Sequence, residues 1–252
     1  IEINLIVIIY FQLQVYILKS MTVQVLYKNM SKSSNLGVIA LFTEDKFQLK
    51  KANNFLSKKE VLYVEKIVKN KIKTKENIIS LNVNEKTTLI LISIKNDLKS
   101  SDVENMGAEF YNFIKKNSFE DISIYTESVK SKPGKDFIGR FMHGLKLKSY
   151  EFNLYKSKKT KKIIKINLIG KQNSLFLSNK LKFKALEEGT FFTRDLVSEP
   201  GNILHPDEYA KRLNSLKKYG LKINIYDERK LKKLGMNTLL GVGQGSIRGS
   251  YL

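Results

Sequence analysis

Short runs of aliphatic and β-branched residues recur along residues 21 to 170, and this recurrence is the feature that most limits the fold. Helical patterns fill the gaps between the later runs, from Asp102 to about Lys116 and over 136–147. Strands that alternate with helices form mixed or parallel sheets covered by helices. The sequence therefore predicts an N-terminal mixed-sheet α/β domain over 21–170. The runs expected as strands are 22–27, 36–42, 61–68, 77–83, 87–94, 121–126, 150–155 and 163–169.

The first of these helices has a defined apolar stripe. Its members recur at three- and four-residue steps and are Val103, Met106, Phe110, Phe113 and Ile114. Asp102 follows two serines, and we expect its carboxylate to cap the helix.

A second unit is predicted near residue 200. A long helical pattern runs from Ser174 to about Val197, ends at Pro200-Gly201 and is interpreted as a linker helix over 171–199. A helix over 204–220 follows, with Pro206 in its first turn and Gly220 as its terminator. A strand over 222–227 and a short helix over 228–235 come next. Residues 200–252 therefore read as the start of a second α/β domain.

The stretch LGMNTLLGVGQGS, residues 234–246, carries glycines at 241, 243 and 245. A dinucleotide loop needs G-x-G-x-x-G, and a Walker loop needs Gly-Lys-Ser or Gly-Lys-Thr after its glycines. Neither spacing is present, so we expect a glycine-rich turn that leaves a strand.

The charge balance is strongly basic, with 45 Lys and Arg against 24 Asp and Glu and a formal net charge of +21. Such a field attracts nucleic acid. The densest basic stretch is KSKKTKK at 156–162, between two predicted strands. A basic α/β module that binds nucleic acid without catalysis is therefore kept as the alternative function, although solvated lysines need no partner and are favoured.

The chain has no cysteine, which excludes disulfides and thiolate metal sites and fits a reducing cytoplasm. His143 and His205 lie far apart and lack H-E-x-x-H spacing. We expect His143 to be a packing or surface residue of its helix. No catalytic, cofactor-binding or metal-binding residue is assigned within the chain.

Residues 1–20 are largely apolar but are interrupted by Gln12 and Gln14. The segment lacks a basic leader and a small-residue cleavage site, which disfavours a secretory signal. Our preferred interpretation takes Met21 as the natural start and 1–20 as a non-native upstream extension. A buried strand pair and a membrane anchor remain the alternatives.

Several short motifs near the C-terminus occur in a fixed order. They are Arg194–Val197, Pro200–Asn202, Asp227-Glu228, Leu234–Met236 and Gly243–Ser246. In this order they resemble the leucyl (cytosol) aminopeptidase family at the entrance to its catalytic domain. The resemblance is dense over about 190–252 and weaker over 144–159. One departure is His205, where the family usually has a threonine that caps the following helix.

The resemblance implies a metallo-exopeptidase that removes N-terminal residues, leucine among them, from peptides. It implies two divalent metal ions, manganese or zinc, in each subunit of a cytoplasmic homo-hexamer, with no membrane association. The family's ligands lie in a lysine motif and an Asn-Thr-Asp-Ala-Glu-Gly-Arg motif, and neither occurs here. We therefore expect a chain with a truncated catalytic domain over 200–252 that is inactive alone.

Overall fold

The computed structural model describes residues 22–28, 37–48, 56–71, 76–95, 97–129, 136–157, 162–170 and 174–252. It divides into two compact units, with the boundary between Phe191 and Phe192. Residues 1–20 and the centre of the lysine-rich stretch, 158–161, lie outside the described part. The interpretations of both segments, and the domain bounds inferred from sequence, stay predictions.

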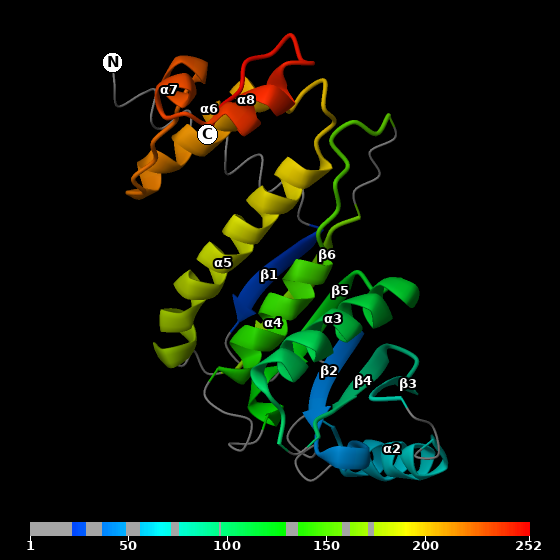
Figure 1. The fold of residues 1–252 in the computed structure, drawn as a ribbon. Helices are drawn as coiled ribbons and strands as arrows, with labels where there is room; N and C mark the ends of the chain where they lie inside the picture. The colour runs from blue at the N-terminus through cyan, green and yellow to red at the C-terminus, as the bar shows by residue number, and fades with distance from the viewer. Residues whose placement is uncertain are drawn as a thin grey trace, which may run out of the picture. The chain divides into compact units, whose positions relative to one another are not determined.

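A mixed β-sheet forms the centre of the first unit (Figure 1). Its described strands lie in the order β1-β6-β5-β2-β4-β3, and only the β3–β4 pair is antiparallel. The predicted mixed-sheet α/β fold is thus confirmed. The strands are β1 (Val23–Lys28), β2 (Gly37–Thr43), β3 (Ile78–Asn84), β4 (Thr87–Ser93), β5 (Asp121–Tyr125) and β6 (Ile164–Ile169).

The central strands are apolar on both faces, which is why their sequences are continuous aliphatic runs. Leu89, Ile90, Leu91 and Ile92 of β4 are all fully buried. The hairpin between β3 and β4 turns at Glu85-Lys86, where the Asn84 side-chain oxygen accepts a hydrogen bond from the Lys86 backbone N–H at 2.9 Å. Short 3₁₀ turns follow β2 and β5, as η1 (Asp45–Phe47) and η3 (Thr126–Ser128).

Two helices, α3 (Ser100–Lys116) and α4 (Phe137–Lys148), lie side by side over one face of the sheet (Figure 1). Their backbones approach closely at two glycines. A Cβ added at Gly107 would lie 1.9 Å from the Phe141 carbonyl oxygen, and one at Gly144 would lie 1.8 Å from that of Glu104. Next to this contact, Phe110 and Phe141 pack in the core between the two helices and the sheet.

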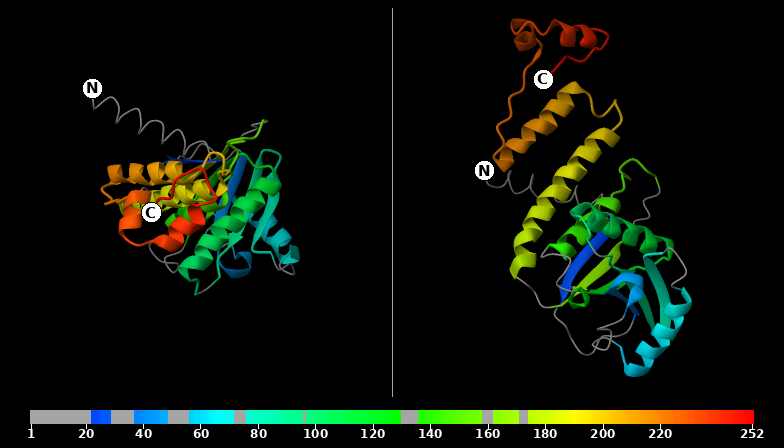
Figure 2. Two further views of the ribbon diagram at one scale, coloured as in Figure 1. Left: turned by 45° about the horizontal axis from the view of Figure 1, so that its top comes forward. Right: turned by 60° about the horizontal axis from the view of Figure 1, so that its bottom comes forward.

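The opposite face is covered by α2 (Lys58–Lys71), beside the β3 and β4 edge (Figures 1 and 2). The sequence prediction of a strand over 61–68 is wrong here. Val61, Val64 and Val68 are β-branched, but their spacing is helical and all three are buried. Ser57 and Glu60 exchange hydrogen bonds at the start of the helix, as in a capping box.

The expected cap of α3 also needs correction. Asp102 is the third helical residue, and its carboxylate accepts a hydrogen bond from the Lys99 backbone N–H at 2.8 Å. The predicted strand over 150–155 does not form: residues 151–153 are irregular and 154–155 are a turn. Tyr150 and Phe152 pack individually, on Phe191 and Tyr155, so their alternation in sequence does not reflect a sheet.

The long helix predicted before Pro200 is α5 (Ser174–Ser198). The second unit then contains α6 (Pro206–Asn214), η4 (Ser215–Tyr219), α7 (Glu228–Lys233) and α8 (Asn237–Gly243). Gly220 ends η4 with a left-handed φ of 82°, which confirms its predicted role as terminator.

Two predictions in the second unit are wrong. Residues 222–227 form no strand, and none of them is buried. Tyr226 instead exchanges backbone hydrogen bonds with Leu252, at 2.7 and 3.0 Å. The glycine-rich stretch is largely helical, since Gly241 and Gly243 belong to α8 and only Gly245 follows it.

Candidate functional site

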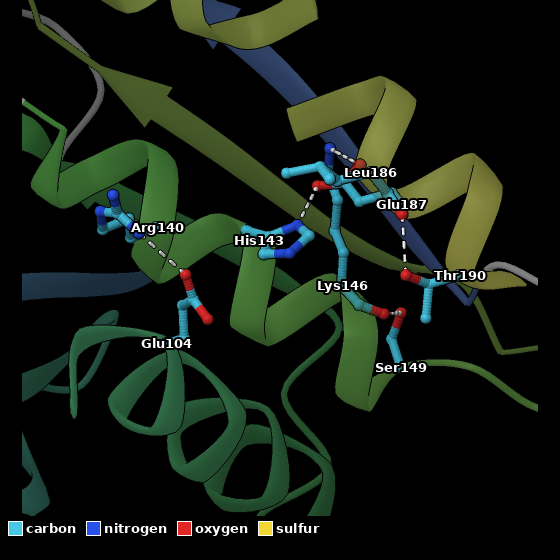
Figure 3. Close-up of polar contacts among 8 residues, drawn as sticks. All are labelled: Glu104, Arg140, His143, Lys146, Ser149, Leu186, Glu187 and Thr190. Carbon is cyan, nitrogen blue, oxygen red and sulfur yellow. Dashed lines mark hydrogen bonds and ion pairs between the residues drawn. The ribbon is translucent and has the colours of Figure 1, made fainter. Parts of the chain in front are cut away.

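The main buried charged group of the first unit is Glu187 on α5, which is 4% exposed. Its Oε2 accepts a hydrogen bond from Lys146 Nζ at 2.8 Å, and its Oε1 lies 3.4 Å from His143 Nδ1 (Figure 3). Both partners come from α4. Burying a carboxylate is strongly unfavourable without such partners. The two α4 side chains therefore explain how the fold accommodates the buried charge of Glu187.

Tyr27 of β1 belongs to the same surroundings. Burial, together with the negative charge of Glu187, raises the pKa of the Tyr27 hydroxyl. Lys180 Nζ lies 4.4 Å from the Tyr27 ring centroid, in cation–π geometry. The sequence predicted a packing or surface role for His143, and its 7% exposure favours the packing role. The role of Glu187 was not predicted. The signal in the sequence was its spacing, because Glu187 lies one helical turn after Phe183 and one before Phe191.

In the second unit Arg212 of α6 joins two carboxylates. Its Nη1 donates to Glu199 Oε1 and its Nε to Glu208 Oε1, each at 3.1 Å. The Glu199 side chain is only 1% exposed. Guanidinium groups suit such paired contacts because their donors lie in one plane. This arrangement ties the segment after α5 to α6.

Asp207, in the first turn of α6, contacts His205 Nδ1 and lies 3.2 Å from Arg248 Nη1. Residual desolvation raises the pKa of Asp207, but its own backbone N–H, His205 and Arg248 outweigh this and lower the pKa overall. His205 occupies the N-cap without a capping hydrogen bond from its side chain. The side-chain cap that a threonine would supply at this position is therefore missing, as the sequence departure suggested.

The second acidic pair, Asp227 and Glu228, stabilises the backbone. Asp227 caps α7 by accepting from the Lys230 backbone N–H at 2.9 Å. Glu228 Oε1 accepts from the Ser250 backbone N–H at 3.1 Å. These contacts hold α7 and the last residues of the chain together within the second unit.

The described side chains do not fit a metal centre. No three His, Asp or Glu residues of the described part lie close enough to hold a metal ion. Glu199, Glu208 and Asp207 face guanidinium groups, and Asp227 and Glu228 accept backbone N–H groups. Charge pairing and helix capping are the chemistry that these carboxylates perform here.

The motifs singled out from sequence occupy distinct local positions. Arg194–Val197 lie in the last turns of α5, and Pro200 accepts backbone hydrogen bonds from Ile203 and Leu204, both at 2.9 Å. The Leu234–Met236 motif is the turn between α7 and α8, where the Met236 N–H reaches the Leu231 carbonyl at 3.1 Å. Within the described range no helix is long and apolar enough to cross a membrane.

Comparison with known sequences identifies the relatives of this chain. Residues 191–252 match the sequence model of the "Cytosol aminopeptidase family, catalytic domain". The chain is 36% identical over 148 residues to the "Probable cytosol aminopeptidase" of Sinorhizobium medicae (strain WSM419), covering 53% of this chain and 28% of that protein. It is 35% identical over 143 residues to the protein of the same description from Phytoplasma mali (strain AT), with coverages of 54% and 29%. The chain thus spans less than a third of these curated relatives.

Solved structures give the same fold. A tomato leucine aminopeptidase mutant superposes with a TM-score of 0.71 and 14% identity, covering 92% of this chain and 50% of that one. The bottromycin maturation enzyme BotP in complex with Mn gives a TM-score of 0.61 at 14% identity, with coverages of 85% and 43%. At this identity the likeness carries the architecture alone.

Proposed function

We propose that this chain is part of a metallo-exopeptidase of the cytosol aminopeptidase family, which releases N-terminal residues from peptides. The observation that carries the proposal is the match of residues 191–252 to the family's catalytic domain. The proposed substrates are peptides with leucine or similar residues at the N-terminus. The proposed assembly is a homo-hexamer in the cytoplasm.

The proposed cofactors are two divalent ions, manganese or zinc, in each subunit. Manganese is supported by the structural neighbour BotP, which was solved in complex with Mn. A pair of such ions activates a water and polarises the scissile carbonyl. The residues described here do not fit this metal pair, because their carboxylates are engaged with arginines and backbone N–H groups. We therefore derive no catalytic step from them.

The proposed contribution of residues 192–252 is structural. The pairs of Arg212 with Glu199 and Glu208 hold the turn after α5 against α6. The Asp207–Arg248 pair and the Tyr226–Leu252 backbone bonds hold the end of the chain within the same unit. These contacts would keep the N-terminal part of a catalytic domain ordered. The metal ligands of that domain would come from other residues.

The first experiment measures hydrolysis of leucine p-nitroanilide by the purified chain with manganese present. We expect no turnover above buffer and no saturable manganese binding by calorimetry. The second arm is a chimera in which the Phytoplasma mali relative supplies the sequence that aligns after Leu252. We expect metal-dependent turnover from the chimera that is abolished by a chelator.

Two outcomes would contradict the proposal. A chimera that folds and binds manganese but hydrolyses no N-terminal residue would argue against an aminopeptidase. Turnover that copurifies with residues 1–252 alone, and persists in material from a host without aminopeptidases, would overturn the expected inactivity of the isolated chain.

A further inference from the structure

The contact between α4 and α5 is a seam of four successive layers. Asn179 Nδ2 donates to Asp136 Oδ1 in the first layer, and Phe183 covers Gly139 and His143 in the second. From one layer to the next, the residue numbers increase on both segments. The two helices therefore run in the same direction. The remaining layers are Glu187 with His143 and Lys146, and Phe191 with Tyr150.

The layers alternate in chemistry. Asn179 and Glu187 are polar, whereas Phe183 and Phe191 are aromatic, and each residue lies four positions after the one before it. Phe183 and Phe191 are buried, with ring centroids 5.3 Å from His143 and 5.5 Å from Tyr150. Aromatic contacts alone would resist a displacement of α5 by one turn only weakly, because apolar packing is not directional.

The polar layers do not tolerate such a displacement. A shift of α5 by one turn in either direction would place a phenylalanine against Lys146 and remove the carboxylate that lies 2.8 Å from its Nζ. The Lys146 side chain is only 18% exposed, so water would replace that carboxylate poorly. A single buried polar layer can fix the register of packed helices at some expense in stability.

We propose that His143, Lys146 and Glu187 fix the register of α5 on α4, and that Glu187 is a positioning residue. The same helix carries Arg194 and Asp195, which belong to the family motif. A change of register at the seam would be passed along the continuous helix to that motif. This last consequence rests on the proposed function; the register itself does not.

The test uses the absence of natural cysteines, which leaves no background thiols. A native-register reporter carries Asp136→Cys and Asn179→Cys, whose parent side chains are in contact. A shifted-register reporter carries Asp136→Cys and Lys182→Cys, about one helical turn further along. Both reporters leave residues 183–191 unchanged. The measured quantity is the ratio of native to shifted disulfide under mild oxidation.

In the otherwise unchanged chain we expect the native disulfide to dominate. The key background is the double substitution Lys146→Met/Glu187→Leu, which replaces the ion pair with apolar groups. Such replacements are often neutral or stabilising, so we expect little change in Tm but a fall of fivefold or more in the ratio. Glu188→Leu is the matched control, because Glu188 pairs along the helix surface with Lys184 at 3.7 Å.

An unchanged ratio in the folded double variant would overturn the proposal. If that variant does not fold, Glu187→Gln serves in its place, because it keeps the shape of the side chain and removes its charge. We then expect at least a twofold fall in the ratio, and an unchanged ratio again overturns the proposal. The readout is independent of peptidase activity, so it distinguishes failure of the register from failure of the proposed function.

Discussion

At the scale of single residues, Gly107 and Gly144 decide how closely α3 and α4 approach. A methyl group at Gly144 would overlap the Glu104 carbonyl, which is backbone and cannot swing aside. We expect Gly144→Ala to lower the free energy of unfolding by about 2 kcal/mol or more, measured by urea denaturation. Gly189→Ala is the control, because a Cβ there meets no atom within 4 Å and helix propensity favours alanine. Equal effects of the two substitutions would contradict the close contact.

The Glu151–Lys115 pair predicts a pH effect at the same scale. The hydrogen bond from Lys115 Nζ, at 2.6 Å, lowers the pKa of Glu151, and the same bond raises the pKa of Lys115. A carboxyl whose folded pKa is depressed stabilises the fold above its unfolded value, 4.5, and loses this as pH falls through the folded value. Lys115→Met should therefore flatten the stability profile below about pH 5.

The direct measurement for this pair is the Glu151 carboxyl titration by NMR. We expect its pKa to rise toward the ordinary value in Lys115→Met and to stay depressed in Lys116→Met, the neighbouring exposed lysine. The pair is largely solvated, so only a small part of the total stability should change. A Glu151 pKa that is indifferent to Lys115 would refute the assignment.

At the scale of elements, α7 depends on the cap supplied by Asp227. We expect Asp227→Ala to cost about 1 kcal/mol in local stability and Asp227→Ser to retain most of it, since serine also caps helices. Hydrogen exchange of the Leu231 and Leu234 amides, which bond to carbonyls at the helix start and within α7, reports the change. If Ser and Ala behaved alike, the carboxylate would have a role other than capping.

The junction between α5 and α6 depends on Arg212. Arg212→Met removes both charged hydrogen bonds, including the one to the nearly inaccessible Glu199. The expected loss is about 2 kcal/mol, read from thermal unfolding of the second unit. Lys211→Met is the matched control, because the Lys211 side chain is 81% exposed and should change stability by less than about 0.5 kcal/mol. Comparable losses from both would argue against the bridge.

At the scale of the whole molecule, α5 completes the first unit. A fragment of residues 21–170 contains the sheet, and we expect it to unfold cooperatively, as predicted from sequence. It lacks Phe183, Glu187 and Phe191, however, and so exposes the α4 face that these residues cover. A fragment of 21–198 should therefore show a Tm higher by several degrees. Equal melting temperatures would mean that the seam adds no stability.

The sequence by itself determined the strands of the described sheet and the end of the long helix before Pro200, because buried strands and helix terminators have local signatures. β4 could be identified from its aliphatic run, and Gly220 from its position after a helical pattern. The family resemblance was also local, since short ordered motifs carried it and the match over 191–252 supports it.

Tertiary structure alone decided the features that depend on distant partners. Val61, Val64 and Val68 have strand propensity, but their helical spacing places all three on one side of α2, and packing against the sheet favoured that pattern. Tyr150 and Phe152 alternate as in a strand, yet α5 supplies the partner of one and a local turn that of the other. The charge of Glu187 became a buried contact because α4, more than 40 residues earlier, brings Lys146 and His143 to it. No pattern along the chain specifies such a pairing, because the free energy of burying a charge depends on which groups the completed fold places around it.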